Sequence, residues 1–304
     1  MIKVAISGAD SPEAGELVRI LVNHPDVELK ALIAPALEGK DITTAHHGLI
    51  GEPPMRFCSG LPEKIDVLFV CGSSLSVSDF RRLRVSRGKL KIILLHPIEG
   101  EFSDDEEIPV YGMPEINRKS LVRGALSAVV PTPLASLALV PLYPLAYNLL
   151  LNGDLSLRYY LPFFLSDAGS SEKAKEEIRR ELTHAQRSFT GSIEIASART
   201  ASERGAELEV EIRCPIDMEH ISEFYAMYDD HHFAFPVTSP VSINDVEGTD
   251  KCIFTMSKPE RDTLRIHAVA DPRMRGGAGE AVHIMNLLCQ LHEKTGLALK
   301  ASRF

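Results

Sequence analysis

The reactive side chains of this sequence are few and widely spaced. Its cysteines are scattered, odd in number and without a C-x-x-C pair: Cys58, Cys71, Cys214, Cys252 and Cys289. This spacing predicts neither a structural zinc site nor a disulfide framework. Cys71 follows the apolar run 66–70, at a strand end where a cofactor could bind, so it is a weak candidate nucleophile. The alternative is a small buried apolar residue at that strand end.

The histidines offer one weak candidate for an acid or base. His184 lies with Arg187 at the end of a charged helical stretch, and the alternative is a histidine on a helix surface. The histidine pairs at 46–47 and 231–232 invite a metal hypothesis. Adjacent histidines point in different directions, however, and no acidic, histidine or cysteine partner stands at ligand spacing, so no metal is expected.

Strands and helices alternate in the first half of the chain. Short apolar runs have the length of buried strands, at residues 2–6, 27–33, 65–70 and 90–95. Residues 13–22, in contrast, have apolar side chains at helical spacing. The first run ends at Gly8, where the backbone must turn. This alternation predicts a doubly wound parallel sheet.

The pattern changes after about Asn152. The expected helices here are 170–183, 218–228 and 279–294, and the expected strands are 192–196, 207–213, 251–256 and 263–269. The predicted fold class is therefore α/β. It combines a Rossmann-like doubly wound parallel sheet domain with an α+β domain that has a mixed or antiparallel sheet.

Composition excludes several classes of protein. The 304 residues are 44% hydrophobic and 25% charged, as in an ordinary soluble globular protein. The net charge of −9 argues against binding to nucleic acid or to an anionic membrane surface. Residues 124–151 carry almost no charge, but they contain four prolines and so predict a buried core helix after a proline-rich loop. The chain begins with a strand-like run and no secretory signal, so we expect a cytoplasmic protein.

Three segments carry a resemblance to a known family. They read E-L-V-R-I-L at 16–21, V-Y-G-M-P-E-I-N-R at 110–118 and R-G-G-A-G-E-A-V at 275–282. The chain thereby resembles the N-acetyl-gamma-glutamyl-phosphate reductases, which are relatives of the aspartate-semialdehyde dehydrogenases. The resemblance implies a Rossmann-like dinucleotide-binding domain at 1–130, completed by a C-terminal helix within 276–304. It implies an α+β domain of the catalytic or dimerisation type at 131–275.

The same resemblance implies a weakened NADP site. The family's G-x-x-G-x-x-G phosphate turn falls on Gly8, Ser11 and Ala14, of which only the first is glycine. The end of the second strand, at 34–37, has no acidic residue or arginine to read the ribose. The other cofactor contacts that the resemblance implies are Gly72, Gly279 and Asn286.

A further site implied by the resemblance is an anion site at the start of the last helix. Arg275 matches the family's lysine before a glycine-rich helix start, where backbone N–H groups favour anions. Glu280 stands where the family has glutamine, which places a negative charge there. The alternative is an ordinary glycine-rich helix start with a surface arginine.

The nucleophile that the family uses has no counterpart in this sequence. The family reads roughly N-P-G-C-Y-P-T, whereas residues 129–134 read V-V-P-T-P-L, and no cysteine lies between Gly72 and Arg213. Thr132 is the only hydroxyl in this loop, and oxygen nucleophiles without a strong base substitute poorly for a thiolate. The family's H-R-H-x-P-E segment is also absent.

Three functions follow from these observations. The first is a divergent reductase-like protein without thioester chemistry, which binds a nucleotide or a small acidic metabolite or regulates an active paralogue. The second is an active NADP-dependent N-acyl-gamma-glutamyl-phosphate reductase of arginine biosynthesis that uses non-standard residues. The third is a purely structural or regulatory protein. The resemblance also predicts a homo-oligomer, or a hetero-oligomer with a paralogue.

Overall fold

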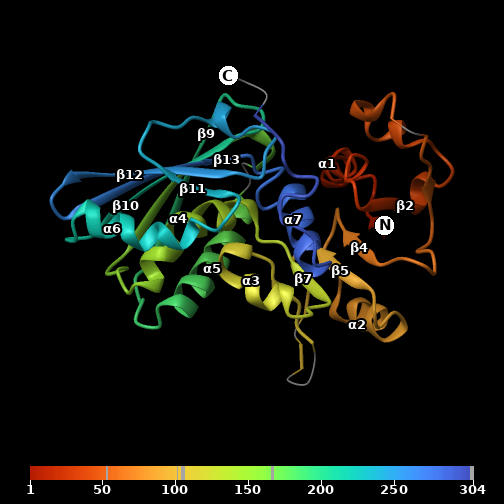
Figure 1. Cartoon of the computed structure of the whole chain (residues 1–304), viewed down its shortest axis with the longest axis horizontal. Helices are drawn as coiled ribbons and strands as arrows, with labels where there is room; N and C mark the ends of the chain where they lie inside the picture. The colour runs from red at the N-terminus through yellow and green to blue at the C-terminus, as the bar shows by residue number, and fades with distance from the viewer. Residues whose placement is uncertain (53, 101, 104–106, 166–167, 302–304) are drawn as a thin grey trace. The chain divides into compact units, whose positions relative to one another are not determined.

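The chain folds into two compact units. A computed structural model describes residues 1–52, 54–100, 102–103, 107–165 and 168–301 (Figure 1). Unit 1 consists of Met1–Pro131 and Gly277–Ala298, and unit 2 consists of Thr132–Gly276 and Leu299–Phe304. Unit 1 is therefore made of two stretches of chain that are separated by the whole of unit 2.

Unit 1 contains a parallel sheet whose described part has seven strands in the order β3-β2-β1-β4-β5-β7-β6. The strands are β1 (Ile2–Ser7), β2 (Val27–Ile33), β3 (Phe57–Cys58), β4 (Val67–Val70), β5 (Lys91–Leu94), β6 (Val110–Tyr111) and β7 (Ser127–Val129). The helices are α1 (Pro12–Leu21), α2 (Val77–Ser86), α3 (Pro114–Val122) and α7 (Ala278–Leu288), and short 3-10 turns lie at η1 (Pro35–Leu37), η2 (Ile42–Thr44) and η3 (His47–Leu49). The predicted doubly wound parallel sheet is confirmed, and its strand order reverses direction between β1 and β4.

The central strands are apolar on both faces because helices cover both sides of the sheet. All four residues of β4 are buried, which matches the continuous apolar run that a doubly covered parallel strand needs. Helix α1 begins at Ser11, whose side-chain oxygen accepts a hydrogen bond from Ala14 N, and Pro12 follows in the first helical turn. Its buried face includes Leu17 and Leu21.

Helix α7 is buried along its whole length. All its residues from Ala278 to Leu288 are buried, and it packs against α1, α3 and β5. The helix expected at 279–294 ends six residues early, because Gln290 adopts a left-handed φ of 58°. The side-chain amide of Asn286 then donates to the carbonyl oxygens of Glu293 at 3.0 Å and Thr295 at 2.9 Å. These hydrogen bonds hold the segment 293–295 against helix α7.

A buried carboxylate with two partners lies beside the same segment. Glu293 is 4% exposed, and its carboxylate lies 2.8 Å from His283 Nε2 and 2.7 Å from the guanidinium of Arg118. Burial alone would raise the pKa of Glu293. The contacts with His283 and Arg118 outweigh burial and lower that pKa to about 2.

We predict that Glu293→Gln removes a part of the acid sensitivity of the fold. The folded pKa of Glu293 is about 2 and the reference value is 4.5, so the carboxylate stabilises the fold above the reference value. This contribution is lost as the pH falls towards the folded pKa, and its full size is about 3 kcal/mol. Urea unfolding near neutral pH should show a less stable variant, and the difference should shrink near pH ~3. Exposed Glu52→Gln is the control, and equal pH profiles for wild type and Glu293→Gln would contradict the prediction.

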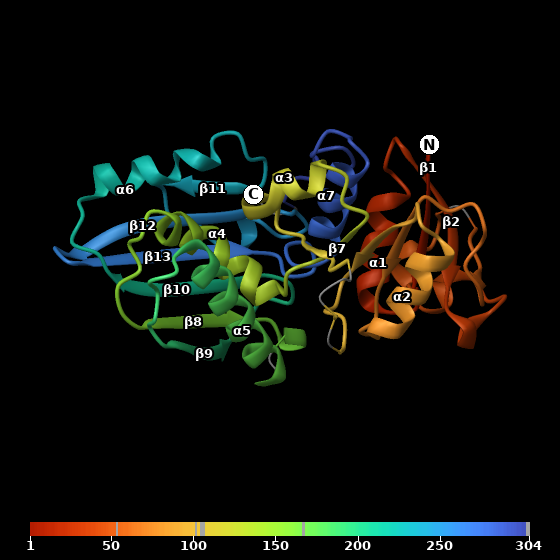
Figure 2. The same cartoon turned by 90° about the horizontal axis from the view of Figure 1, so that it is seen from below.

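Unit 2 is a mixed sheet with helices on one face. Its described strands follow the order β11-β12-β13-β10-β8-β9, in which β8–β9 and β11–β12 are parallel pairs and the others are antiparallel. The strands are β8 (Leu155–Leu161), β9 (Ile193–Arg199), β10 (Ala206–Arg213), β11 (Ala234–Val237), β12 (Cys252–Glu260) and β13 (Thr263–Ala270). The helices are α4 (Pro133–Tyr147), α5 (Ala168–Ala185) and α6 (Met218–Phe224), and 3-10 turns lie at η4 (Phe163–Leu165), η5 (Tyr225–Tyr228) and η6 (Ile243–Asp245). Helices α4 and α5 lie against the same face of the sheet (Figure 2).

The apolar segment after residue 124 forms the buried helix α4, as predicted. Two prolines lie inside this helix, Pro141 and Pro144. Because proline has no N–H group, the carbonyl of Val140 loses the helical donor that residue 144 would provide. The hydroxyl of Tyr228 replaces that donor at 2.6 Å, and the hydroxyl of Tyr225 donates to the neighbouring carbonyl of Pro141 at 2.6 Å. No helix within the described ranges is both long and apolar enough to cross a membrane.

We predict that Tyr228→Phe destabilises the protein by about 1–3 kcal/mol, because the Val140 carbonyl would lose its buried donor. Chemical denaturation followed by circular dichroism measures the change. Tyr160→Phe is the matched control, since its hydroxyl bonds Glu209 at the sheet surface and its loss should cost less than about 0.5 kcal/mol. Equal effects of the two variants would contradict the role given to Pro144.

Candidate nucleotide-binding turn and catalytic-loop position

The turn after β1 brings together several of the residues predicted to contact a cofactor. Gly8 has a left-handed φ of +68°, and a Cβ there would lie 2.2 Å from the carbonyl oxygen of Cys71. Gly72 has a φ of +76°, and a Cβ there would lie 3.3 Å from Ser11 Cβ. The turn therefore packs directly on the segment after β4. In doubly wound sheets ligands bind at this edge, where the strand order reverses. We call residues 8–15 the nucleotide turn.

Glu13 is the charged group of this turn, and the sequence did not single it out. Its carboxylate accepts a hydrogen bond from the backbone N–H of Gly72 at 3.0 Å and lies 3.0–3.1 Å from His96 Nε2. The three residues come from the first turn of α1, the segment after β4 and the segment after β5. Burial alone would raise the pKa of Glu13, but the bonds to His96 and Gly72 outweigh it, so the pKa lies below its usual value.

The remaining backbone of the nucleotide turn is bonded largely within the chain. Ala14 N donates to Ser11 Oγ at 3.3 Å, and Gly15 N donates to the Ser11 carbonyl at 3.2 Å. His46 covers the same turn, with Nε2 at 2.7 Å from the Ala9 carbonyl. A Cβ on Gly15 would lie 2.7 Å from the His46 ring, so glycine is needed there for this histidine to fit. The Ala14 N–H and the space beside Gly15 are thus occupied by groups of the protein.

The catalytic-loop position, residues 129–134, holds a carboxylate at the start of α4. Thr132 precedes this helix, and its hydroxyl donates to Glu177 Oε2 at 2.6 Å. Its backbone N–H donates to the same carboxylate at 3.1 and 3.3 Å. Glu177 reaches the position from α5 and is 8% exposed. A carboxylate is favoured there because the N-terminus of a helix carries partial positive charge.

Arg275 and Gly276 pack against the same helix start. Gly276 has a φ of +69°, and a Cβ there would lie 2.4 Å from the Cα of Pro133. Arg275 is fully buried, and its Nε donates to Ser136 Oγ at 2.8 Å, one turn along α4. The side chain predicted to bind an anion is thus enclosed within unit 2, with at least one of its donors already used.

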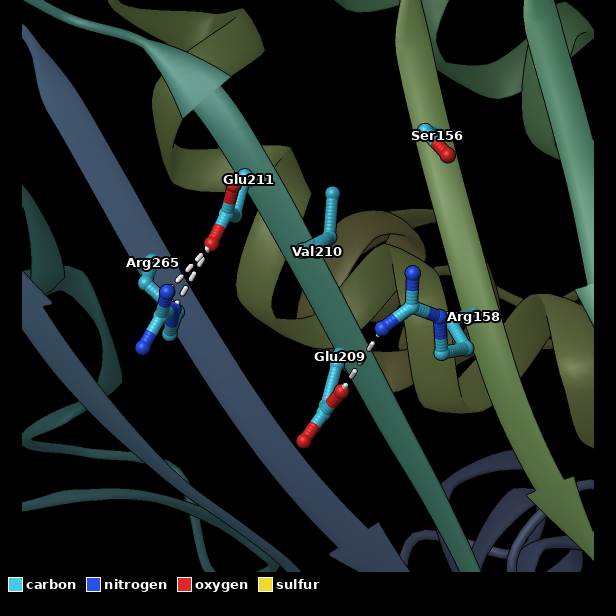
Figure 3. A pocket seen from close by; sticks show the side chains of 6 residues that line it. All are labelled: Ser156, Arg158, Glu209, Val210, Glu211 and Arg265. Atoms are coloured by element: carbon cyan, nitrogen blue, oxygen red, sulfur yellow. Dashed lines mark hydrogen bonds and ion pairs between the residues drawn. The ribbon is translucent and has the colours of Figure 1, made fainter.

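The open face of the unit 2 sheet carries ion pairs. A hollow of about 320 Å³ is lined by Ser156, Arg158, Glu209, Val210, Glu211 and Arg265. In Figure 3 the charged side chains pair across neighbouring strands, Arg158 with Glu209 at 3.7 Å and Arg265 with Glu211 at 2.6 Å. Among the described residues, no group of three or more histidine, cysteine, aspartate or glutamate side chains could hold a metal ion.

Comparison with known proteins decides the family. No protein-family model matches the chain. The N-acetyl-gamma-glutamyl-phosphate reductase of Parabacteroides distasonis is 33% identical, and the similarity covers all of both chains. The chain belongs to the N-acetyl-gamma-glutamyl-phosphate reductase family. The reductase of Phocaeicola vulgatus, at 32% identity over the full length of both chains, is similar to the same extent.

Solved structures share the fold of this reductase-family chain. Aspartate semialdehyde dehydrogenase II of Vibrio cholerae, complexed with ASA, has a TM-score of 0.69 at 15% identity and covers 95% of this chain and 98% of its own. Aspartate semialdehyde dehydrogenase of Candida albicans with NADP has a TM-score of 0.69 at 13% identity, with the same coverage. At such low identity the likeness concerns the fold alone.

The other predicted site residues of this reductase-family member are Cys71, His184, Gly279 and Asn286. Cys71 is 2% exposed, and burial, with a smaller contribution from the charge of Glu13, raises the pKa of its thiol well above the usual value. His184 is exposed near the end of α5. Gly279 and Asn286 lie inside buried α7, and the amide oxygen of Asn286 lies 3.0 Å from His24 Nε2. The amide of Asn286 thus bonds to the protein on both its oxygen and its nitrogen.

We predict that Cys71 resists alkylation in the native protein, because its thiol is buried and the reactive thiolate is disfavoured. Native protein is treated with iodoacetamide and mapped by peptide mass spectrometry. Cys58, which is half-buried, should react about tenfold faster or more. The urea-unfolded protein provides the control in which both cysteines react. Faster labelling of Cys71 than of Cys58 would restore it as a candidate nucleophile.

Proposed function

We propose that this chain is a member of the reductase family that acts by binding and does not form a cysteine thioester. The observation that carries the proposal is the carboxylate of Glu177 at the start of α4, bonded to both the hydroxyl and the N–H of Thr132. In the family pattern this loop supplies a thiolate. In this chain the loop instead supplies the hydroxyl of Thr132, which already donates its proton to the carboxylate of Glu177.

The chemistry of this loop argues against an acyl-enzyme. Thr132 donates its hydroxyl proton to a carboxylate, and a carboxylate is far too weak a base to ionise an alkyl hydroxyl. The loop therefore offers no activated nucleophile.

The proposed ligand is a nucleotide or a small acidic metabolite, because the relatives are named for an N-acetyl-glutamyl phosphate. The proposed partner is a second copy of this chain or an active paralogue.

The second candidate function is an active NADP-dependent reductase of arginine biosynthesis. Full-length similarity to curated reductases favours it, and a related fold has been solved with NADP. In this alternative the hydride would reduce an acyl phosphate to a semialdehyde with release of phosphate, and an unrecognised group would carry the acyl chain.

An assay of reduction and acylation tests the proposal. We predict no oxidation of NADPH with N-acetyl-gamma-glutamyl phosphate and no acyl adduct in the intact mass. The Parabacteroides distasonis relative, assayed in parallel, is the positive control. Sustained NADPH oxidation with formation of semialdehyde would contradict the proposal. An adduct that disappears in Cys71→Ser would identify the alternative nucleophile.

A further inference from the structure

Glu13 occupies a distinctive place in unit 1. It projects from the nucleotide turn to Gly72 and His96, and so links the segments that follow β1, β4 and β5. These segments flank the point where the strand order reverses, between β1 and β4. A dinucleotide bound to a doubly wound sheet places its pyrophosphate at this point, against the start of the first helix.

We propose that Glu13 is an internal anion that takes the place of a ligand pyrophosphate and determines whether a dinucleotide can bind. The inference rests on the proposed function and narrows its ligand, because it excludes dinucleotides from the wild-type turn. Glu13 performs two of the tasks that a phosphate would perform. It accepts the Gly72 N–H, and it supplies negative charge beside the first turn of α1.

The rejection of dinucleotide has an electrostatic and a hydrogen-bonding component. A pyrophosphate placed within hydrogen-bond distance of Gly72 N would lie within a few ångströms of the Glu13 carboxylate. Two like charges this close repel each other, although solvent screens part of the repulsion because the Glu13 side chain is partly exposed. The donor that would offset this repulsion already bonds to Glu13. The Ala14 N–H at the start of α1 is also taken, because it bonds to Ser11 Oγ.

The carboxylate is held in place but is not enclosed. The side chains of Glu13 and His96 are 37% and 34% exposed, so Glu13 has solvent into which it could move. Removing the carboxylate should therefore free the Gly72 N–H without opening a cavity in the core. His96 would remain beside the vacated place.

Titration calorimetry and thermal shift with NADP⁺ test the inference. Wild type is compared with Glu13→Ala, Glu13→Gln and Asp10→Asn. Asp10→Asn is the matched control, since Asp10 is exposed in the same turn and its change removes the same charge without touching the Gly72 bond. We expect no heat for wild type and Asp10→Asn up to about 1 mM, and at least about tenfold tighter binding to Glu13→Ala. Glu13→Gln, which keeps the size and one acceptor oxygen, should lie between them.

Two outcomes would overturn the inference. One is micromolar NADP⁺ binding to the wild type, which would mean that Glu13 does not exclude the cofactor. The other is equal affinity of wild type, Glu13→Ala and Glu13→Gln. Should Glu13→Ala fold poorly, Glu13→Gln and His96→Ala still decide the matter, because His96→Ala removes one anchor of Glu13 and should give a smaller gain in affinity.

The reductase assay on the same proteins separates this inference from the proposed function. If Glu13→Ala binds NADP⁺ and does not reduce the acyl phosphate, both stand. If Glu13→Ala binds and also reduces it, Glu13 controls the site but the non-reducing function is wrong. If wild type binds without reducing, the function stands and the role of Glu13 is wrong.

Discussion

Backbone N–H groups at helix starts and in the loops that follow strands need acceptors, and in this chain two glutamates meet that need at the candidate site. Glu13 accepts the Gly72 N–H beside the start of α1, and Glu177 accepts the Thr132 N–H at the start of α4. Each carboxylate also complements the positive end of its helix. We propose that both carboxylates take the place of a ligand anion. The proposal therefore rests on these two contacts as well as on the missing cysteine.

Local hydrophobic pattern was sufficient to predict most of the architecture. Strand β2 matches its predicted range of 27–33, and α1 differs from its range by one residue at each end, because apolar spacing is read from nearby residues. Strands β3 and β6 could not be predicted, since each has only two residues and exists through pairing with a distant strand. Strand β8 was not predicted, although its side chains alternate between buried and exposed. The early end of α7 depends on bonds from Asn286 to residues beyond the helix.

Less of the candidate site than of the fold could be predicted from the sequence. The altered glycine turn and the absence of cysteine at 129–134 can be read directly from the residues. The partners of the two glutamates cannot, because Gly72 and His96 lie 59 and 83 positions from Glu13, and Thr132 lies 45 positions from Glu177. An acidic residue in the first turn of a helix is so common that Glu13 carries no functional signal by itself. Glu13 becomes a candidate only in the structure, because there it lies where the strand order reverses between β1 and β4.

The division of unit 1 into two stretches has a consequence for how the protein is made. Synthesis proceeds from the N-terminus, so residues 1–131 emerge before the buried helix that completes their core at Ala278–Leu288. The intervening residues 132–276 are continuous and can finish folding first. At ordinary translation rates that interval lasts roughly 7–30 s. During this interval the faces of α1, α3 and β5 that α7 will cover are exposed, so the incomplete sheet is open to aggregation until the helix arrives.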